Sequence, residues 1–345
     1  MSKYRQLFVF LIFGLFLIGP VFAADSPSLK ASHPDRYVVQ RGDNLWDISG
    51  RFLQAPWRWP EIWYVNPQVQ NPHLIYPGDL IELSYIDGKP RLSLKRGSMV
   101  KLSPRIRESA IDAAIPAIPV SAIHPFLSRP YVLDAPALDS PYIVSFGQDH
   151  IVGSSHVKAY VRALTEEQPI HFDVVRPGKE YRDADTDELL GYEGLFVGSA
   201  ELLKTGDPAT VMLREMQLEF VIGDRLVPEV QGVSTANFIP KKPSQPILGS
   251  IISVLNGVSQ IGQYNIVVID KGERDGLSTG SVLNINRRGE MIRDTVNKRS
   301  GTKVQLPDEP AGTLMVFRVF ERVSFGLVMH ATDAMHLGDR VVNPD

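Results

Sequence analysis

Prolines recur in two stretches of this 345-residue chain, and they set the strongest limit on what it can fold into. In the first stretch they stand at positions 116, 119, 125, 130, 136 and 141. Proline fixes φ and lacks a backbone N–H, so this stretch suits neither a helix nor a central strand. We predict an extended segment that follows the surface. The second stretch, 240–246, has the composition of a stiff linker or long turn.

The proline breaks divide a chain that is too long for one ordinary core, so two to three domains are expected. After the first folded unit the pattern changes to short β-rich runs separated by Gly and Asp. These runs are Tyr142–Phe146, Ser155–Ala163, Val211–Val221, Tyr264–Ile269 and Gly280–Asn286. We predict two mostly-β domains, a middle one over 85–240 that includes the proline segment 115–141, and a C-terminal one over 247–345.

A phrase in the middle domain is echoed in the last one. Residues 220–228 and 335–344 each place a Gly-Asp pair before a short apolar run, and each follows an earlier apolar run at a matching distance. One interpretation is a duplicated strand, Gly-Asp turn, strand unit. The other is that Gly-Asp turns are simply common. The sequence leaves both open.

The N-terminus begins with a charged region, an apolar run over 7–18 and a small-residue site ending at Ala23. This pattern predicts a cleaved signal peptide over 1–23 and a polar spacer over 24–36, with a periplasmic mature protein. The alternative is an uncleaved anchor, but the run is short for a bilayer that needs ~20 apolar residues. The chain has no cysteine, which excludes a lipid-modified N-terminus, a disulfide framework and a thiol nucleophile.

The first folded unit starts with an alternating strand at Tyr37–Gln40 and a turn whose Asp43 or Asn44 can cap a helix. Apolar residues at 45, 48 and 52 then give that helix one buried face. A proline at 60 suits the first turn of a second helix, which Asn66-Pro67 ends. A closing strand at Leu80–Leu83 can pair antiparallel with the first. The predicted order is βααβ, and the fold class of the whole chain is therefore α+β.

Residues 37–84 resemble a LysM domain, the βααβ glycan-binding module of cell-wall proteins. The resemblance rests on Tyr37-x-Val39-x-x-Gly42-Asp43-x-Leu45-Trp46-x-Ile48, on Asn66-Pro67 and on Leu74-Ile75-Tyr76-Pro77-Gly78-Asp79-x-Ile81. Two features depart from the family pattern. Asn44 stands where Thr is usual, which keeps a polar cap, and residues 54–61 form a longer, Trp-rich bridge between the helices.

The resemblance implies a shallow groove that takes the N-acetylglucosamine units of peptidoglycan. Its walls would be the loop after the first strand and the loop before the last one. The candidate glycan-binding residues are Gly42, Asp43, Asn44, Leu45, Asn71, Pro72, His73, Leu74, Ile75 and Tyr76. A neutral sugar needs convergent hydrogen-bonding groups and an apolar face, which these loops can supply.

All four tryptophans lie in this module, at 46, 57, 59 and 63. A small module needs large side chains to build a core, and we expect Trp46 and Trp63 to serve that purpose. Trp57 and Trp59 lie on the unusual bridge. They fit a core role or a stacking platform for sugar rings about equally well.

The sequence favours a protein that is not an enzyme. The eight histidines make no His-x-His or His-Glu-x-x-His pattern, so we expect no metal site and no cofactor. The acidic run 183–188 fits a solvated turn better than a calcium loop. With 36 basic against 39 acidic side chains, the chain lacks a field that would hold nucleic acid.

The order of signal peptide, one module and a long C-terminal region resembles the type IV pilus secretin-associated proteins. Residues 271–281 and 337–341 also resemble the C-terminal domain of a flagellar outer-ring assembly protein. These resemblances imply a non-enzymatic protein that tethers an envelope machine, foremost the outer-membrane secretin ring, to peptidoglycan. The alternatives are a cell-wall hydrolase or remodelling factor and a general wall-binding adaptor unrelated to pili.

Overall fold

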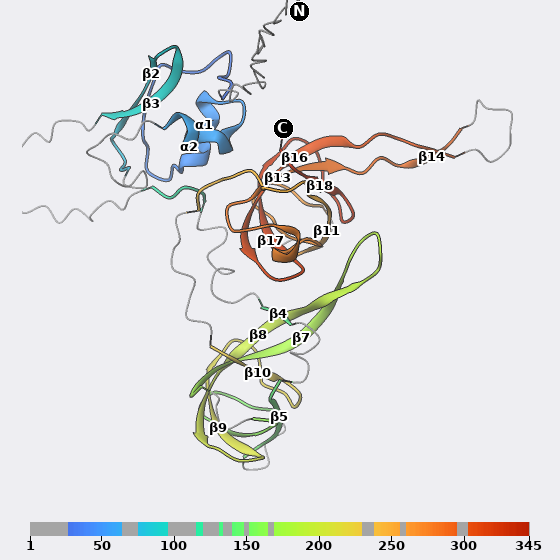
Figure 1. Cartoon of the computed structure of the whole chain (residues 1–345). Helices are drawn as coiled ribbons and strands as arrows, with labels where there is room; N and C mark the ends of the chain where they lie inside the picture. The colour runs from blue at the N-terminus through green and yellow to red at the C-terminus, as the bar shows by residue number, and fades with distance from the viewer. Residues whose placement is uncertain are drawn as a thin grey trace, which may run out of the picture.

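The computed structural model describes ten stretches of the chain, and the fold within them is mostly β (Figure 1). The stretches are residues 27–63, 75–95, 115–119, 131–133, 140–147, 152–164, 169–229, 238–255, 260–294 and 303–344. The predicted signal peptide lies outside the described residues. None of the helices in the described part has the length and apolar character needed to cross a membrane.

The N-terminal module contains the predicted strand, two helices and strand, followed by one more strand. Its elements are β1 (Arg36–Val38), α1 (Leu45–Phe52), the 3₁₀ turn η1 (Pro56–Arg58), α2 (Trp59–Ile62), β2 (Leu80–Ile86) and β3 (Lys89–Lys95). The predicted antiparallel pairing is present, with Tyr37 opposite Ile81. The third strand pairs along β2 and adds Leu92 and Leu94 to the core.

Helix α1 begins where the sequence predicts. The Asn44 side chain accepts a hydrogen bond from the Asp47 amide at 2.9 Å, which satisfies one of the free N–H groups at the helix start. Leu45, Ile48 and Phe52 are buried on one face. The predicted spacer also joins the module, since the Lys30 amide donates to the Phe52 carbonyl at 2.8 Å.

The middle region folds into a six-stranded barrel, here called the first barrel. Its strands are β5 (Tyr142–Phe146), β6 (Lys158–Arg162), β7 (His171–Arg182), β8 (Leu189–Lys204), β9 (Ala209–Met216) and β10 (Arg225–Pro228). The order is β8-β7-β10-β5-β6-β9, and it returns on itself because β9 also pairs with β8. A short strand, β4 (Tyr131–Leu133), pairs with β8 at its outer edge.

The C-terminal region forms a closed barrel, here called the second barrel. Its strands are β11 (Leu248–Val254), β12 (Ile266–Ile269), β13 (Val282–Arg287), β16 (Glu309–Val319), β17 (Ser324–Ala331) and β18 (Arg340–Val342). A 3₁₀ turn, η3 (Glu273–Asp275), follows β12. Two strands, β14 (Met291–Arg293) and β15 (Lys303–Gln305), extend the β13–β16 hairpin into an arm. The predicted linker 240–246 is held to this barrel by a Lys241 amide bond to the Gly280 carbonyl at 2.9 Å.

The two barrels share one strand order. With the strands numbered one to six along the chain, both read 1-2-5-4-3-6 before they close. The echoed Gly-Asp turns take equivalent places, since Gly223 and Gly338 each donate to a first-strand carbonyl, Ile143 and Ile251, at 2.8 Å. The module contains a similar turn at Gly78, so the turn alone shows no duplication. The common strand order shows that the two barrels share one topology, and a duplication of this unit stays a prediction.

The acidic run 183–188 is a turn with five of its six residues exposed, as the sequence predicts, but the sequence did not show that this turn contacts another domain. It forms the tip of the β7–β8 hairpin, which docks on the second barrel. There Lys271 Nζ lies 3.0 Å from Asp183 Oδ2, and Arg340 donates to Asp185 Oδ1 at 3.0 Å. The cations come from residues far along the chain, so the local composition could not show them.

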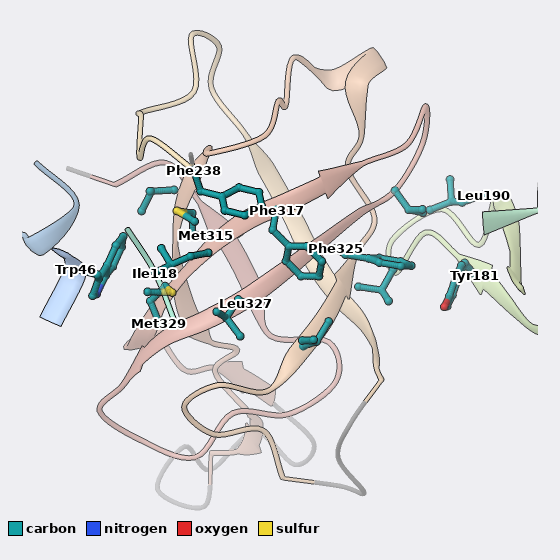
Figure 2. Packing of buried hydrophobic residues seen from close by; sticks show 14 residues of the cluster. Trp46, Ile118, Tyr181, Leu190, Phe238, Met315, Phe317, Phe325, Leu327 and Met329 are labelled. Atoms are coloured by element: carbon teal, nitrogen blue, oxygen red, sulfur yellow. The ribbon is translucent and has the colours of Figure 1, made fainter. Parts of the chain in front are cut away.

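Two neutral side chains complete this contact between the barrels. Tyr181 and Leu190, near the hairpin tip, are each 2% exposed and pack beside Phe325 of the second barrel (Figure 2). Burial raises the pKa of the Tyr181 hydroxyl, with a further contribution from the Glu193 charge. The hairpin therefore brings both apolar area and charge to the joint between the barrels.

Candidate functional site

The first wall of the predicted groove is the turn before α1. The Asp43 carboxylate accepts from the Gln40 amide at 2.8 Å and from the Tyr37 hydroxyl at 2.9 Å. Burial raises the pKa of Tyr37, and the bond to Asp43 raises it further. With Asp43 holding the turn and Asn44 capping the helix, the groups left to face a ligand are the backbone N–H groups of Leu45 and Trp46.

The second wall is the loop before β2. Of its six candidate residues, Asn71 to Leu74 lie outside the described residues. Ile75 is fully buried, and the Tyr76 amide donates to Asp79 Oδ2 at 3.0 Å. This bond closes the turn into β2, and the Gly78 amide joins the turn to the end of β1 by donating to the Val39 carbonyl at 2.8 Å. The described part of the predicted site is therefore brought together as two facing walls.

A segment of the chain itself lies between these walls. Residues 115–119, here called the strap, accept a hydrogen bond from Leu45 N–H at the Pro116 carbonyl (3.0 Å) and from Trp46 N–H at the Ala117 carbonyl (3.1 Å). The strap also donates from Ile115 N–H to the Ile75 carbonyl at 2.7 Å. The backbone groups expected to meet a sugar are thus bonded to the strap.

The strap is buried, in contrast to the surface segment that its prolines predict. Ile115 and Ala117 are 4% and 5% exposed and pack in the core of the module, whereas Ile118 is fully buried against the second barrel. Proline rules out a ladder position but does not prevent an extended segment from being covered on both sides. The strap therefore joins the module to the second barrel.

Trp46 is buried as predicted, but it packs at the contact between the module and the second barrel, here called the module joint, and not in the core of the module. Figure 2 shows it beside Ile118, Met315 and Met329, at the side of the second barrel opposite Tyr181. Helical spacing indicated an inward face, and it could not show that a second domain covers that face.

Of the two bridge tryptophans, Trp59 takes the core role, whereas a stacking role for Trp57 stays a prediction. Trp59 and Trp63 are buried in the module core, with rings edge to face at 6.1 Å between centroids. Trp57 is partly buried and packs against the second barrel. Among the four, the ring of Trp57 keeps the largest share of its surface near solvent, on the wall of a crevice.

This crevice separates the module from the second barrel and has a volume of about 540 Å³. Polar side chains from both parts line it, among them Arg51 from α1 and Asn284 and His330 from the barrel. A long hydrogen bond crosses the joint, from the Tyr264 hydroxyl to Asp47 Oδ2 at 3.4 Å. The joint is thus packed around Trp46 and Ile118 and loosely filled elsewhere.

The acidic residues considered for chemistry have structural partners. Asp224 lies in its Gly-Asp turn and pairs with Arg176 at 2.8 Å, and Asp339 closes the equivalent turn by accepting from the His336 amide at 2.8 Å. Within the described residues, no cluster of three or more His, Cys, Asp or Glu side chains could hold a metal ion. These carboxylates hold turns and joints together.

Comparison with known proteins identifies the module. A family model described as the LysM domain matches residues 37–84. YqbP of Bacillus subtilis (strain 168), an uncharacterized protein, is 34% identical over 62 residues, which are 15% of this chain and 28% of that protein. The chain therefore carries a LysM module, a type that binds peptidoglycan or chitin-like glycans and is typically extracytoplasmic and wall-associated. The family match ends at residue 84, before the first barrel begins.

Proposed function

We propose that the protein is a non-enzymatic, periplasmic anchor that binds the N-acetylglucosamine units of peptidoglycan in the groove between residues 42–45 and 71–76. The observation that carries the proposal is the position of the LysM match, which contains both walls of the groove. The export step rests on the signal-peptide pattern of the sequence.

The strap supports this proposal through its own chemistry. It presents one amide N–H to the Ile75 carbonyl and two amide carbonyls to Leu45 N–H and Trp46 N–H. An N-acetyl group offers the same functional groups, an amide N–H and C=O, next to an apolar methyl. The groove therefore already recognises amides, and an acetamide can make bonds of the same kind.

Glycan binding at this groove requires the strap to leave. Leu45 N–H and Trp46 N–H cannot donate to the strap and to a sugar with good geometry at the same time. The apparent affinity is then reduced by the fraction of molecules in which the groove is open. The loosely filled crevice beside Trp57 makes such opening less costly than it would be at a closely packed joint.

Titration of the full chain with a soluble N-acetylglucosamine oligomer tests both steps. Ala117→Asp places a charge at a buried strap position and should release the strap, so binding should tighten several-fold over wild type. Lys242→Asp, at an exposed position of the linker, is the matched control and should bind like wild type. If none of the three proteins binds, the groove is not a glycan site. If all three bind equally, the strap does not compete.

In this proposal the barrels bind a partner protein, and the module anchors that partner to the wall. On the sequence resemblance, we propose the type IV pilus secretin ring. One weak groove is sufficient there because many copies on one ring raise the effective concentration of each further contact. A chain lacking residues 27–95 should still co-purify with the secretin. Its failure to do so, with the isolated module succeeding, would assign the contact to the module.

A further inference from the structure

The two barrels extend the same hairpin, the one between their third and fourth strands. In the first barrel this is β7–β8, whose tip lies on the second barrel. In the second barrel it is β13–β16, lengthened by the arm of β14 and β15. Figure 1 shows the arm projecting away from the second barrel. Equivalent elements thus have different surroundings.

The docked hairpin combines an apolar pair with charges near its tip. Tyr181 and Leu190 are buried against the second barrel, and Asp183 and Asp185 beyond them meet cations there. The receiving surface of the second barrel consists of the end of β12, the β16–β17 turn and the start of β18. This contact shows how an extended hairpin of this kind docks on a barrel, through an apolar pair and charged side chains near its tip.

The arm also combines an apolar pair with charges, here the cations Arg293 and Lys303 beside the anion Asp294. Ile292 and Val304 face each other across the two strands and are 41% and 42% exposed, next to Met291 at 60%. Arg293 and Lys303 also lie directly opposite each other. Like charges opposite each other disfavour a ribbon, and a two-stranded ribbon is marginal in water by itself. The side chains of the arm therefore resemble those of the docked β7–β8 hairpin and suit contact with another surface.

We propose that the arm docks on the first barrel of a second copy of this chain. The first barrel has the equivalent receiving surface, at the end of β6, the β8–β9 turn and the start of β10. Near it Ile170 and Leu203 are 60% and 47% exposed, and Asp207 of the turn provides a carboxylate, here paired with Arg162. Within one chain, the second barrel already receives the β7–β8 hairpin.

The contact is head to tail. Each copy has one arm and, on its first barrel, one receiving surface that no hairpin in the described part of the chain covers, so the interface joins unlike surfaces. Such an interface builds closed rings or open filaments, not symmetric pairs. The partner of the arm is the first barrel of the next copy. The inference is independent of glycan binding.

Sedimentation velocity of the full chain over a concentration series tests the proposal. The average mass of wild type should rise with concentration up to about 100 µM, the range of a weak interface. The arm variant Ile292→Asp/Val304→Asp and the surface variant Ile170→Asp/Leu203→Asp should each stay monomeric. Tyr85→Asp, at an exposed apolar position of the module, should associate like wild type. Thermal unfolding checks that all variants are folded.

Mixing the two defective variants gives the sharpest result. The arm variant keeps an intact receiving surface, and the surface variant keeps an intact arm. The mixture should therefore form dimers and nothing longer. A wild type that stays monomeric throughout, or an arm variant that associates like wild type, overturns the proposal. An arm-to-arm contact also overturns it, and would show as loss of association in the arm variant alone with no rescue on mixing.

Discussion

The first and second barrels have the same strand order but use their extended hairpins differently. In the first, the β7–β8 tip is pinned to its neighbour by ion pairs and by Tyr181 and Leu190. In the second, the arm keeps its apolar pair exposed. The comparison teaches that topology fixes where a hairpin projects, whereas the side chains near its tip fix what it can bind. Equivalent substitutions in the two barrels should therefore have unequal effects.

The largest difference is expected for the apolar pairs. Tyr181→Ala should lower the free energy of unfolding by about 3–5 kcal/mol, because it leaves a cavity between the barrels. Ile292→Ala on the arm should change it by less than about 0.5 kcal/mol, as at other exposed sites. Urea denaturation of dilute protein measures both values.

Tyr181→Phe provides the control for the aromatic ring. The Tyr181 hydroxyl is buried and has no hydrogen-bond partner among the described residues, so its removal should leave stability unchanged or raise it by up to about 1 kcal/mol. Equal losses for Tyr181→Ala and Ile292→Ala would show that the first hairpin is as free as the second.

The second-largest difference in stability is expected for substitutions in the charged contacts of the two hairpins. Lys271→Met removes the cation between Asp183 and Asp270, whose side chains are 9% and 1% exposed. Leaving these buried carboxylates uncompensated should cost about 2–4 kcal/mol. Glu309→Gln breaks the pair with Arg287 at the base of the arm, where both side chains are exposed, and should cost at most about 1 kcal/mol. Thermal or urea unfolding of both variants tests the ranking.

Acid should undock the first hairpin. Burial opposes ionisation of Asp183, but hydrogen bonds from the Thr186 amide and Lys271 hold its pKa well below its usual value. The bond from Arg340 likewise lowers the pKa of Asp185. These groups stabilise docking above their ordinary pKa, about 4, and the stabilisation is lost as pH falls through the lowered values. Asp270 acts in the opposite sense, since burial raises its pKa.

Energy transfer between one dye on each barrel measures this undocking. The chain has no cysteine, so engineered thiols can be labelled without background. Transfer should fall below about pH 4 in wild type. In Asp183→Asn/Asp185→Asn the fall should be weaker, because less proton uptake is linked to undocking. A pH response unchanged by these substitutions would remove the hairpin tip as its cause.

The smallest effects should be equal in the two barrels. Gly223 and Gly338 have φ of +94° and +90°, with nothing within 4 Å of an added Cβ. Alanine at either place should cost about 1 kcal/mol, from backbone strain alone. Chemical denaturation of the two single variants should give the same loss. A clear inequality would show that the turns are not equivalent.

Local patterns predicted the local structure well. The Asn44 cap, the buried face of α1 and the pairing of β1 with β2 follow from spacing over a few residues. The position of the strap could not be predicted in this way, because its hydrogen bonds join Leu45 to the distant Pro116. The prolines alone indicated only an extended segment. Contacts between distant segments leave no periodic signal.

The same limit applies to the acidic tip and the tryptophans. The sequence of residues 183–188 shows only a polar run, because the cations that pair with it, Lys271 and Arg340, lie far along the chain. Trp46 was predicted to be buried, but its partner is a separate barrel. Of the ten candidate site residues, six are described. They form two facing walls, and whether these bind glycan stays a prediction.

The central claim is that the LysM module anchors this chain to the wall, and sedimentation with insoluble peptidoglycan tests it most directly. The mature protein is compared with a chain lacking residues 27–95, whose barrels are checked for folding by circular dichroism. Our account predicts that the mature protein pellets with the wall and the shortened chain stays in solution. If the mature protein and Ala117→Asp both stay in solution, or if the shortened chain pellets equally, the account is contradicted.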